Sequence, residues 1–182
     1  MGGTGLNAGT SYDFVYYFNS LPSAQIEKWI DLYSHRFTEP VFRLFQSELE
    51  TVYEEKNRAM DNPFRVFNET SRKYFFKNHP YGQQTILGSV EHLKTPSLSK
   101  MKEFYDKYYV PNNMSLIIAG DFDKGSVKKM IKNKFGRLKK GAPIEKINVQ
   151  EDDFNGREVV DLSITPYRIG SLCYRSVEPN HK

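Results

Sequence analysis

Cysteine and histidine are scarce in this sequence of 182 residues. The single cysteine, Cys173, excludes an internal disulfide and a cysteine-rich metal site. No two of the four histidines, His35, His79, His92 and His181, lie four positions apart, so no histidine pair has the spacing of one helical turn. No apolar run approaches the roughly 20 residues of a membrane-spanning helix. The sequence therefore indicates no membrane span.

Aromatic residues, by contrast, are abundant. They make up 14% of the sequence within a hydrophobic share of 38%, so the chain can fold despite its 26% of charged residues. Its length favours one domain with a hydrophobic core and a tail. The formal net charge is +4, and the excess of lysine and arginine lies mostly within residues 124–140.

Hydrophobic periodicity and turn residues predict the order of the secondary structure. In the first half of the chain we expect a strand at 12–18, an amphipathic helix from Ser23 to about Phe37, and a long helix from near Val41 that breaks at Pro63 and resumes to Phe75. A loop with short helical turns then leads to Ser97, where a helix begins that runs to Tyr109. The expected elements after it are a strand at 114–120, a basic helix at 125–135, and strands at 158–165 and 168–177. This order predicts an α+β fold in which helices pack on a mostly antiparallel sheet.

The same patterns predict burial and domain boundaries. The residues expected to face inward are Leu98, Met101, Phe104 and Tyr108 in one helix, Val127, Met130 and Ile131 in the basic helix, and Cys173 in the last strand. Residues 1–138 are expected to form a domain that is incomplete at its N-terminus, residues 139–157 a linker, and residues 158–182 the first strands of a further domain. Both ends of the chain are interpreted as cuts through a longer protein.

Two glutamates of the long helix are the first candidates for chemistry. A step of seven residues is about two helical turns, so Glu48 and Glu55 project from nearly the same face. Apolar residues share that face, which predicts that both carboxylates are partly buried, and a buried carboxylate needs a metal ion or a hydrogen-bonding partner. In the alternative interpretation both acids lie at the exposed edge of the helix, where Arg58 pairs with Glu55.

The glutamates and several other motifs resemble the insulinase/pitrilysin family of zinc metallopeptidases, which includes the mitochondrial processing peptidase. The matching motifs run in order from about Gly3 to Phe135, namely Gly5–Ser11, Glu48–Pro63, His79–Gly82 with Gly88, Tyr108–Met114 and Gly120–Asp123. The resemblance implies that Glu55 is a zinc ligand and that Glu48 is a supporting acid, because a carboxylate behind a metal site can orient a ligand or a water. It makes residues 1–138 a partial catalytic-type peptidase domain.

The family's zinc signature, H-x-x-E-H, is absent from the chain. In relatives this helix supplies two zinc ligands and the general base. One carboxylate does not define a zinc site. We therefore expect zinc in the complete parent protein and none held tightly by this fragment.

The segment from Asn7 to Phe18 has a second implied role. In relatives the corresponding strand edge accepts the substrate peptide as an added strand, so that main-chain groups provide affinity without requiring one sequence. The residues predicted to bind substrate in this way are Asn7 and Ala8. A purely structural strand would have the same pattern.

Lysines of the basic helix offer a remote alternative function. Lys128, Lys129 and Lys132 could contact phosphates of a nucleic acid. A solvated helix face is favoured, because the nearby aromatic residues are placed for the core and not for base stacking. No nucleic-acid partner is therefore expected.

The first functional hypothesis is that the parent protein is a zinc-dependent endopeptidase of peptides or unfolded polypeptides, and that this fragment alone is inactive. The second is a non-catalytic homologue that acts as a scaffold or a partner in a substrate chamber. The expected partners are a peptide substrate and either the remaining domains of the parent or a homologous subunit.

Overall fold

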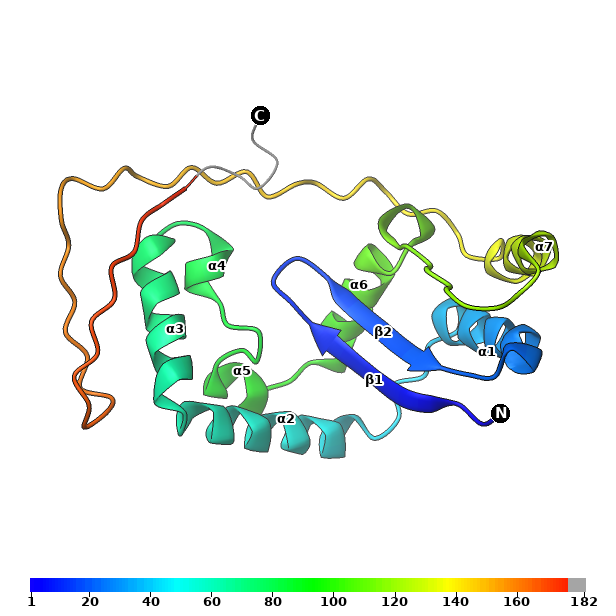
Figure 1. Ribbon diagram of the computed structural model, residues 1–182, viewed down its shortest axis with the longest axis horizontal. Helices are drawn as coiled ribbons and strands as arrows, with labels where there is room; N and C mark the ends of the chain where they lie inside the picture. The colour runs from blue at the N-terminus through cyan, green and yellow to red at the C-terminus, as the bar shows by residue number, and fades with distance from the viewer. Residues whose placement is uncertain (177–182) are drawn as a thin grey trace. The chain divides into compact units, whose positions relative to one another are not determined.

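A computed structural model describes residues 1–176 of the chain. Its elements follow in the order β1 (Thr4–Thr10), β2 (Val15–Ser20), η1 (Ser23–Gln25), α1 (Ile26–Thr38), α2 (Phe45–Met60), α3 (Pro63–Phe75), α4 (Pro80–Gln83), α5 (Val90–Lys94), α6 (Leu98–Tyr108), η2 (Pro111–Asn113) and α7 (Lys124–Phe135) (Figure 1). None of the described helices has the length and apolar character needed to cross a membrane.

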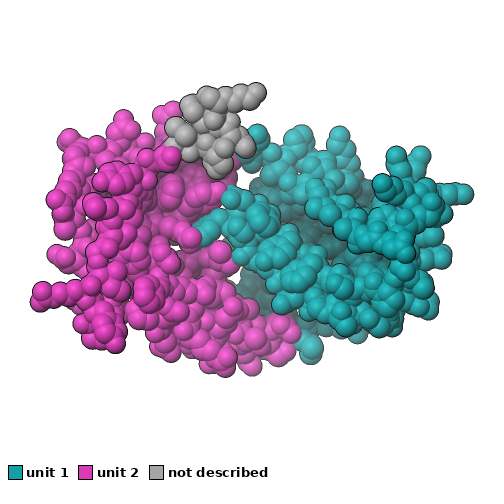
Figure 2. Space-filling model, viewed as in Figure 1, with its two compact units in different colours: residues 1–46, 96–146 teal, residues 47–95, 147–182 magenta. Residues whose placement is uncertain are grey.

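The chain divides into two compact units, each made of two stretches of sequence. The first unit comprises residues 1–46 and 96–146, and the second comprises residues 47–95 and 147–182 (Figure 2). The predicted boundaries of 1–138, 139–157 and 158–182 stay predictions, and the last six residues of that range lie outside the part that the structure describes.

An antiparallel hairpin begins the first unit. Asn7 pairs with Phe18 and Ala8 with Tyr17, and the register shifts between Thr4 and Asn7. Gly5 lies within that shift with a φ of 63°, a left-handed conformation that glycine adopts without a steric penalty. The periodicity that predicts a strand at 12–18 therefore missed β1, because its glycine-rich sequence has little strand propensity of its own. The resemblance, by contrast, implied a strand edge that begins near Asn7.

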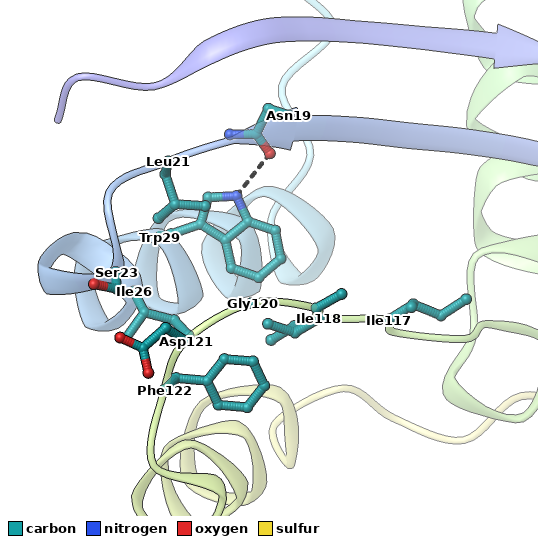
Figure 3. A pocket seen from close by; sticks show the side chains of 11 residues that line it. Asn19, Leu21, Ser23, Ile26, Trp29, Ile117, Ile118, Gly120, Asp121 and Phe122 are labelled. Carbon is teal, nitrogen blue, oxygen red and sulfur yellow. Dashed lines mark hydrogen bonds between the residues drawn. The ribbon is translucent and has the colours of Figure 1, made fainter.

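Helices α1 and α7 enclose the core of the first unit. Trp29, Ile30 and Tyr33 of α1 are buried together with Val127 of α7, and Met130 and Ile131 pack against them. The predicted inward face of α7 is thus confirmed. The indole Nε1 of Trp29 donates a hydrogen bond of 2.9 Å to Asn19 Oδ1, which connects α1 to the end of β2 (Figure 3).

Helix α3 begins where the sequence predicts a break. Asn62 caps it, because its Oδ1 accepts hydrogen bonds from the N–H groups of Phe64 and Arg65 at 3.0 and 3.3 Å. Pro63 is the first helical residue, a position that needs no N–H donor. Helix α2 starts at Phe45 and not near Val41, because Leu44 has a φ of 55° that a right-handed helix cannot contain.

Three of the predicted strands are wrong. Residues 114–120, 158–165 and 168–176 form no strand, while residue 177 lies outside the described part of the chain. A strand needs a hydrogen-bonded neighbour, and within residues 1–176 the sheet contains β1 and β2 alone. The fold class is α+β with a small antiparallel sheet. Without a last strand to bury it, Cys173 is exposed, contrary to prediction.

Helix α6 turns a different face inward from the one that its apolar residues predict. Leu98, Met101 and Phe104 are 45%, 40% and 54% exposed, and of the four residues predicted to face inward Tyr108 alone is half-buried. Tyr105 packs instead, with its ring centroid 5.8 Å from that of Phe42 and 4.4 Å from that of Tyr109. The packed face thus differs from the predicted one by about a quarter turn at 3.6 residues per turn, because aromatic partners elsewhere in the unit select it.

Residues 147–176 pack in the second unit through side chains and not through regular structure. The Glu151 carboxylate accepts hydrogen bonds from the N–H groups of Asn78 and His79 at 2.8 and 2.5 Å. The guanidinium of Arg175 lies 4.2 Å from the ring centroid of Phe154. Desolvation acts to raise the pKa of Glu151, but the N–H donors and the charge of Arg175 outweigh it and hold the pKa below its usual value.

The core of the first unit gives a direct test of the α1 packing. Ile30 is fully buried, so Ile30→Ala should lower the free energy of unfolding by about 2 to 5 kcal/mol, the usual cost of removing a large aliphatic side chain from a core. Leu32→Ala lies on the same helix at a position that is 53% exposed, and it should change that free energy by less than about 0.5 kcal/mol. Urea unfolding followed by the fluorescence of Trp29 measures both, and equal losses would contradict the packing.

Candidate functional site

Helix α2 carries the two candidate glutamates on one face. Seven residues at about 100° each leave Glu48 and Glu55 about 20° apart around the helix axis. Both side chains are exposed. The residues of α2 that are buried or half-buried are Phe45, Leu49, Val52, Tyr53, Lys56 and Ala59. The two carboxylates are therefore not partly buried. They flank the packed face and are exposed, as the alternative interpretation predicts.

Lys56 explains the orientation of α2, and sequence reasoning missed it. Its side chain is 7% exposed, and its Nζ lies 3.4 Å from Glu69 Oε2 on α3. The same amine donates to Thr85 Oγ1 at 3.5 Å. Lys56 lies four residues after Val52 and three before Ala59, so helical spacing places it in the apolar stripe of α2. That position could have predicted its burial. A buried ammonium requires such partners.

No ion pair within residues 1–176 includes Glu48 or Glu55, and the predicted pair between Arg58 and Glu55 does not form. Both carboxylates are thus available to a cation. The same part of the chain contains no group of three or more His, Cys, Asp or Glu side chains placed to hold a metal ion. The side chains of residues 1–176 therefore do not complete a zinc site among themselves. His181 lies outside the described residues.

The candidate peptide-binding residues, Asn7 and Ala8, lie in β1, in the other compact unit from α2. Both are exposed. Among the described residues β1 pairs with β2 on one side only, so it has an edge of the kind that can accept an added strand. Asn7 Oδ1 accepts a hydrogen bond of 2.8 Å from the Ala8 N–H, and a strand that uses this donor must displace the side chain of Asn7.

An aromatic cluster lies in the first unit, between α1, β2 and α6. The hydroxyls of Tyr17 and Tyr109 share a hydrogen bond of 2.8 Å, and the hydroxyl of Tyr105 donates to the Phe37 carbonyl at 3.0 Å. Burial raises the pKa of Tyr105 to about 12. Burial and the hydrogen bond with Tyr17 raise the pKa of Tyr109 still further. The phenols of Tyr105 and Tyr109 therefore remain protonated at neutral pH.

Two cavities lie in the same unit. The larger has a volume of about 660 Å³ and borders the aromatic cluster. The smaller has about 250 Å³ and lies among Asn19, Trp29 and residues 117–122 (Figure 3). It is below the roughly 300 Å³ of ordinary ligand pockets, and the amide oxygen of Asn19 already accepts the hydrogen bond from Trp29.

The basic face of α7 is exposed at Lys128, Lys129 and Lys132. The exposure of these lysines agrees with the solvated helix face that the sequence favours. It would also allow them to contact phosphates. A different lysine of this helix, Lys134, is paired with Asp31 at 2.5 Å, and its hydrogen bond lowers the pKa of that carboxyl. Nucleic-acid binding stays an untested alternative.

Comparison with known proteins gives a consistent result. Residues 97–181 match the family model described as "Peptidase M16 inactive domain". The chain is 30% identical over 141 residues to the zinc protease PqqE of Helicobacter pylori, covering 73% of this chain and 30% of that protein. It is 26% identical over 141 residues to the probable zinc protease PqqL of Escherichia coli, covering 75% of this chain and 15% of that protein.

Two further comparisons extend the similarity. The beta subunit of the mitochondrial-processing peptidase of Dictyostelium discoideum is 25% identical over 141 residues, which cover 76% of this chain and 30% of that protein. The crystal structure of a protease from Helicobacter pylori superposes with a TM-score of 0.67 and 25% identity, covering 81% of this chain and 36% of that one. The chain therefore spans no more than about a third of the length of these relatives.

The pairing of Lys56 with Glu69 predicts unequal effects of two similar substitutions. Glu69→Gln leaves the buried ammonium without its carboxylate and should lower the free energy of unfolding by about 1.5 to 3 kcal/mol, the range for hydrogen bonds to charged groups. Glu55→Gln on exposed α2 surface should change it by less than about 0.5 kcal/mol. Urea unfolding monitored by circular dichroism compares them, and a larger loss in Glu55→Gln would disprove the assigned orientation of α2.

The aromatic cluster predicts a late phase in an alkaline titration of the chain. The ordinary pKa of a tyrosine phenol is about 10, whereas Tyr105 should ionise near pH 12 because it is buried. Since its folded pKa is raised, the stability that it contributes is complete below about pH 10 and is lost as the pH rises through 12. Absorbance at 295 nm measures the titration, and Tyr105→Phe should reduce the late phase alone. A late phase that keeps its full amplitude in this variant would contradict the assignment.

Proposed function

This chain belongs to the insulinase-like M16 family of peptidases, and from that membership we infer that the complete protein is a zinc-dependent endopeptidase. The observation that carries the proposal is the pair of exposed carboxylates, Glu48 and Glu55, on one face of α2 without an ion-pair partner in residues 1–176. The proposed substrates are peptides or unfolded polypeptides.

The proposed roles of the residues follow their placement. Glu55 contributes one carboxylate ligand to zinc, for which carboxylate oxygen is an ordinary donor, and Glu48 supports the site from two turns earlier. Asn7 and Ala8 at the edge of β1 bind the substrate backbone. Because residues 1–176 do not hold three ligands together, the other ligands belong to a different part of the protein or to a partner subunit. On its own the chain is inactive.

A second candidate is supported by the match of residues 97–181 to the model described as "Peptidase M16 inactive domain". Glu48 and Glu55 lie outside these matched residues. In this alternative the chain has a structural role, as a scaffold or as one wall of a substrate chamber. The two functions differ in one measurable property, which is whether zinc and activity depend on Glu55.

The decisive experiment uses the complete protein with three matched substitutions on α2. Glu55→Gln should remove stoichiometric zinc, measured by elemental mass spectrometry, and abolish cleavage of an unfolded polypeptide. Glu48→Gln should lower metal affinity or activity by about 10- to 100-fold, as expected for a group behind the ligands. Glu54→Gln is the control, because this neighbouring exposed glutamate projects about 100° away.

Retention of zinc and activity in Glu55→Gln would overturn the proposed ligand and favour the scaffold. The 182-residue chain supplies the complementary measurement. It should show neither zinc that survives dialysis nor peptide cleavage. If it showed both, and lost both in Glu55→Gln, then the inference that its metal site is incomplete would be wrong.

A further inference from the structure

The larger cavity of the first unit has the size and lining of a ligand site. Its volume of about 660 Å³ falls within the roughly 300 to 1,000 Å³ of pockets that bind small ligands. Its aromatic lining includes Tyr17, Phe37, Phe42, Phe104, Tyr105 and Tyr109. Such a lining favours a flat, apolar group, because aromatic pairs gain contact energy beyond the area that they bury.

One wall of this pocket carries a guanidinium without an acidic partner. Arg36, in the last turn of α1, lies 4.6 Å from the ring centroid of Tyr17 and 5.9 Å from that of Phe37. No salt bridge or hydrogen bond within residues 1–176 engages its side chain, although Glu39 lines the same pocket. The rings hold the guanidinium in place while its planar donors remain open to a carboxylate.

The tyrosine hydroxyls of the pocket already have hydrogen-bond partners within the chain. Tyr17 and Tyr109 bond to each other, and Tyr105 donates to the Phe37 carbonyl. Arg43, a second guanidinium in the lining, has no ion pair in the described chain either, so two positive charges stand against the single negative charge of Glu39. The charge balance of the pocket thus complements an anion.

The outer wall of the pocket is apolar and open to solvent. Val41, Met101 and Phe104 are 71%, 40% and 54% exposed, and all three line the same cavity. Covering them would remove apolar surface from water, which favours binding at about 25 cal/mol per Å². A ligand that fits this site therefore combines an apolar ring with an anionic group close beside it.

We propose that this pocket binds the C-terminus of a peptide that ends in an aromatic residue. The ring of the last residue enters among the aromatic side chains, and its carboxylate pairs with the guanidinium of Arg36. A C-terminal aromatic residue suits the site because one Cα carries both groups, and a guanidinium takes a carboxylate through two parallel hydrogen bonds. The inference is independent of the proposed peptidase function, since binding requires neither a metal nor cleavage.

A pair of probes of nearly the same shape, one anionic and one neutral, tests the proposal. Nuclear magnetic resonance titrations of the ¹⁵N-labelled 182-residue chain compare N-acetylphenylalanine with its neutral amide. Amide shifts should concentrate at Arg36, Phe37, Tyr105 and Tyr109. The carboxylate should bind about threefold to tenfold more tightly than the amide at low salt, as expected for an ion pair open to solvent. The difference should shrink in 1 M salt, where charges are screened within about 3 Å.

Matched variants separate the contribution of charge from that of the ring. Arg36→Gln should bind both probes equally, whereas Arg137→Gln, an exposed arginine outside the pocket lining, should keep the preference for the carboxylate. Phe104→Ala should lower the affinity for both probes by a similar factor. If the spectrum of Arg36→Gln shows that the variant does not fold, Arg36→Lys takes its place and should reduce the preference, because an ammonium lacks the planar pair of donors.

Three outcomes would overturn the proposal. They are equal affinity of the wild-type chain for the two probes, a preference for the carboxylate that survives in Arg36→Gln, and amide shifts that lie outside the pocket. Two further probes test other kinds of ligand. If N-acetylleucine bound more tightly than N-acetylphenylalanine, the requirement for an aromatic ring would be wrong. If N-acetylphenylalanylaspartate amide bound more tightly than N-acetylphenylalanine, the site would instead bind an acidic side chain within a peptide.

Discussion

The buried amine of Lys56 is the interaction on which the orientation of α2 depends. Its partners, Glu69 and Thr85, lie on α3 and in the loop that precedes α5, so one side chain connects three parts of the second unit. A rotation of α2 that buried Glu55 would either expose this amine or separate it from the carboxylate, and an unpaired buried ammonium costs several kcal/mol. The outward direction of Glu48 and Glu55 is therefore a consequence of packing around Lys56.

In the first unit, α1 has a comparable organising role along one side of the helix. Trp29, Ile30 and Tyr33 pack into the core with α7, and the Trp29 indole bonds to Asn19 of β2. One turn later, Arg36 and Phe37 contact the aromatic cluster shared by β2 and α6. The same helix thus contributes to the core and positions the guanidinium of the larger pocket.

The features that the sequence predicts correctly are those set by neighbouring residues. Ser97 caps α6 within three residues, and Pro63 separates α2 from α3, so these boundaries follow from local chemistry. The strand at 114–120 is wrong because a strand depends on a distant partner, and the inward face of α6 is wrong because distant aromatic residues select it. In the same way, helical periodicity places Glu48 and Glu55 on one face, but their exposure depends on Glu69, which is 13 residues from Lys56.

The fixed orientation of α2 also bears on the proposed chemistry. An exposed carboxylate on a mobile segment would lose conformational entropy when it bound a metal, and that loss would weaken binding. Glu55 lies on a helix of 16 residues whose rotation is set by the adjacent Lys56, so its backbone is ordered before any metal arrives. A site whose remaining ligands come from elsewhere needs such a preordered donor, because the geometry of zinc is tetrahedral and tolerates little displacement. In the proposed function, the buried Lys56 has the structural role on this helix and its neighbour in sequence, the exposed Glu55, has the chemical role.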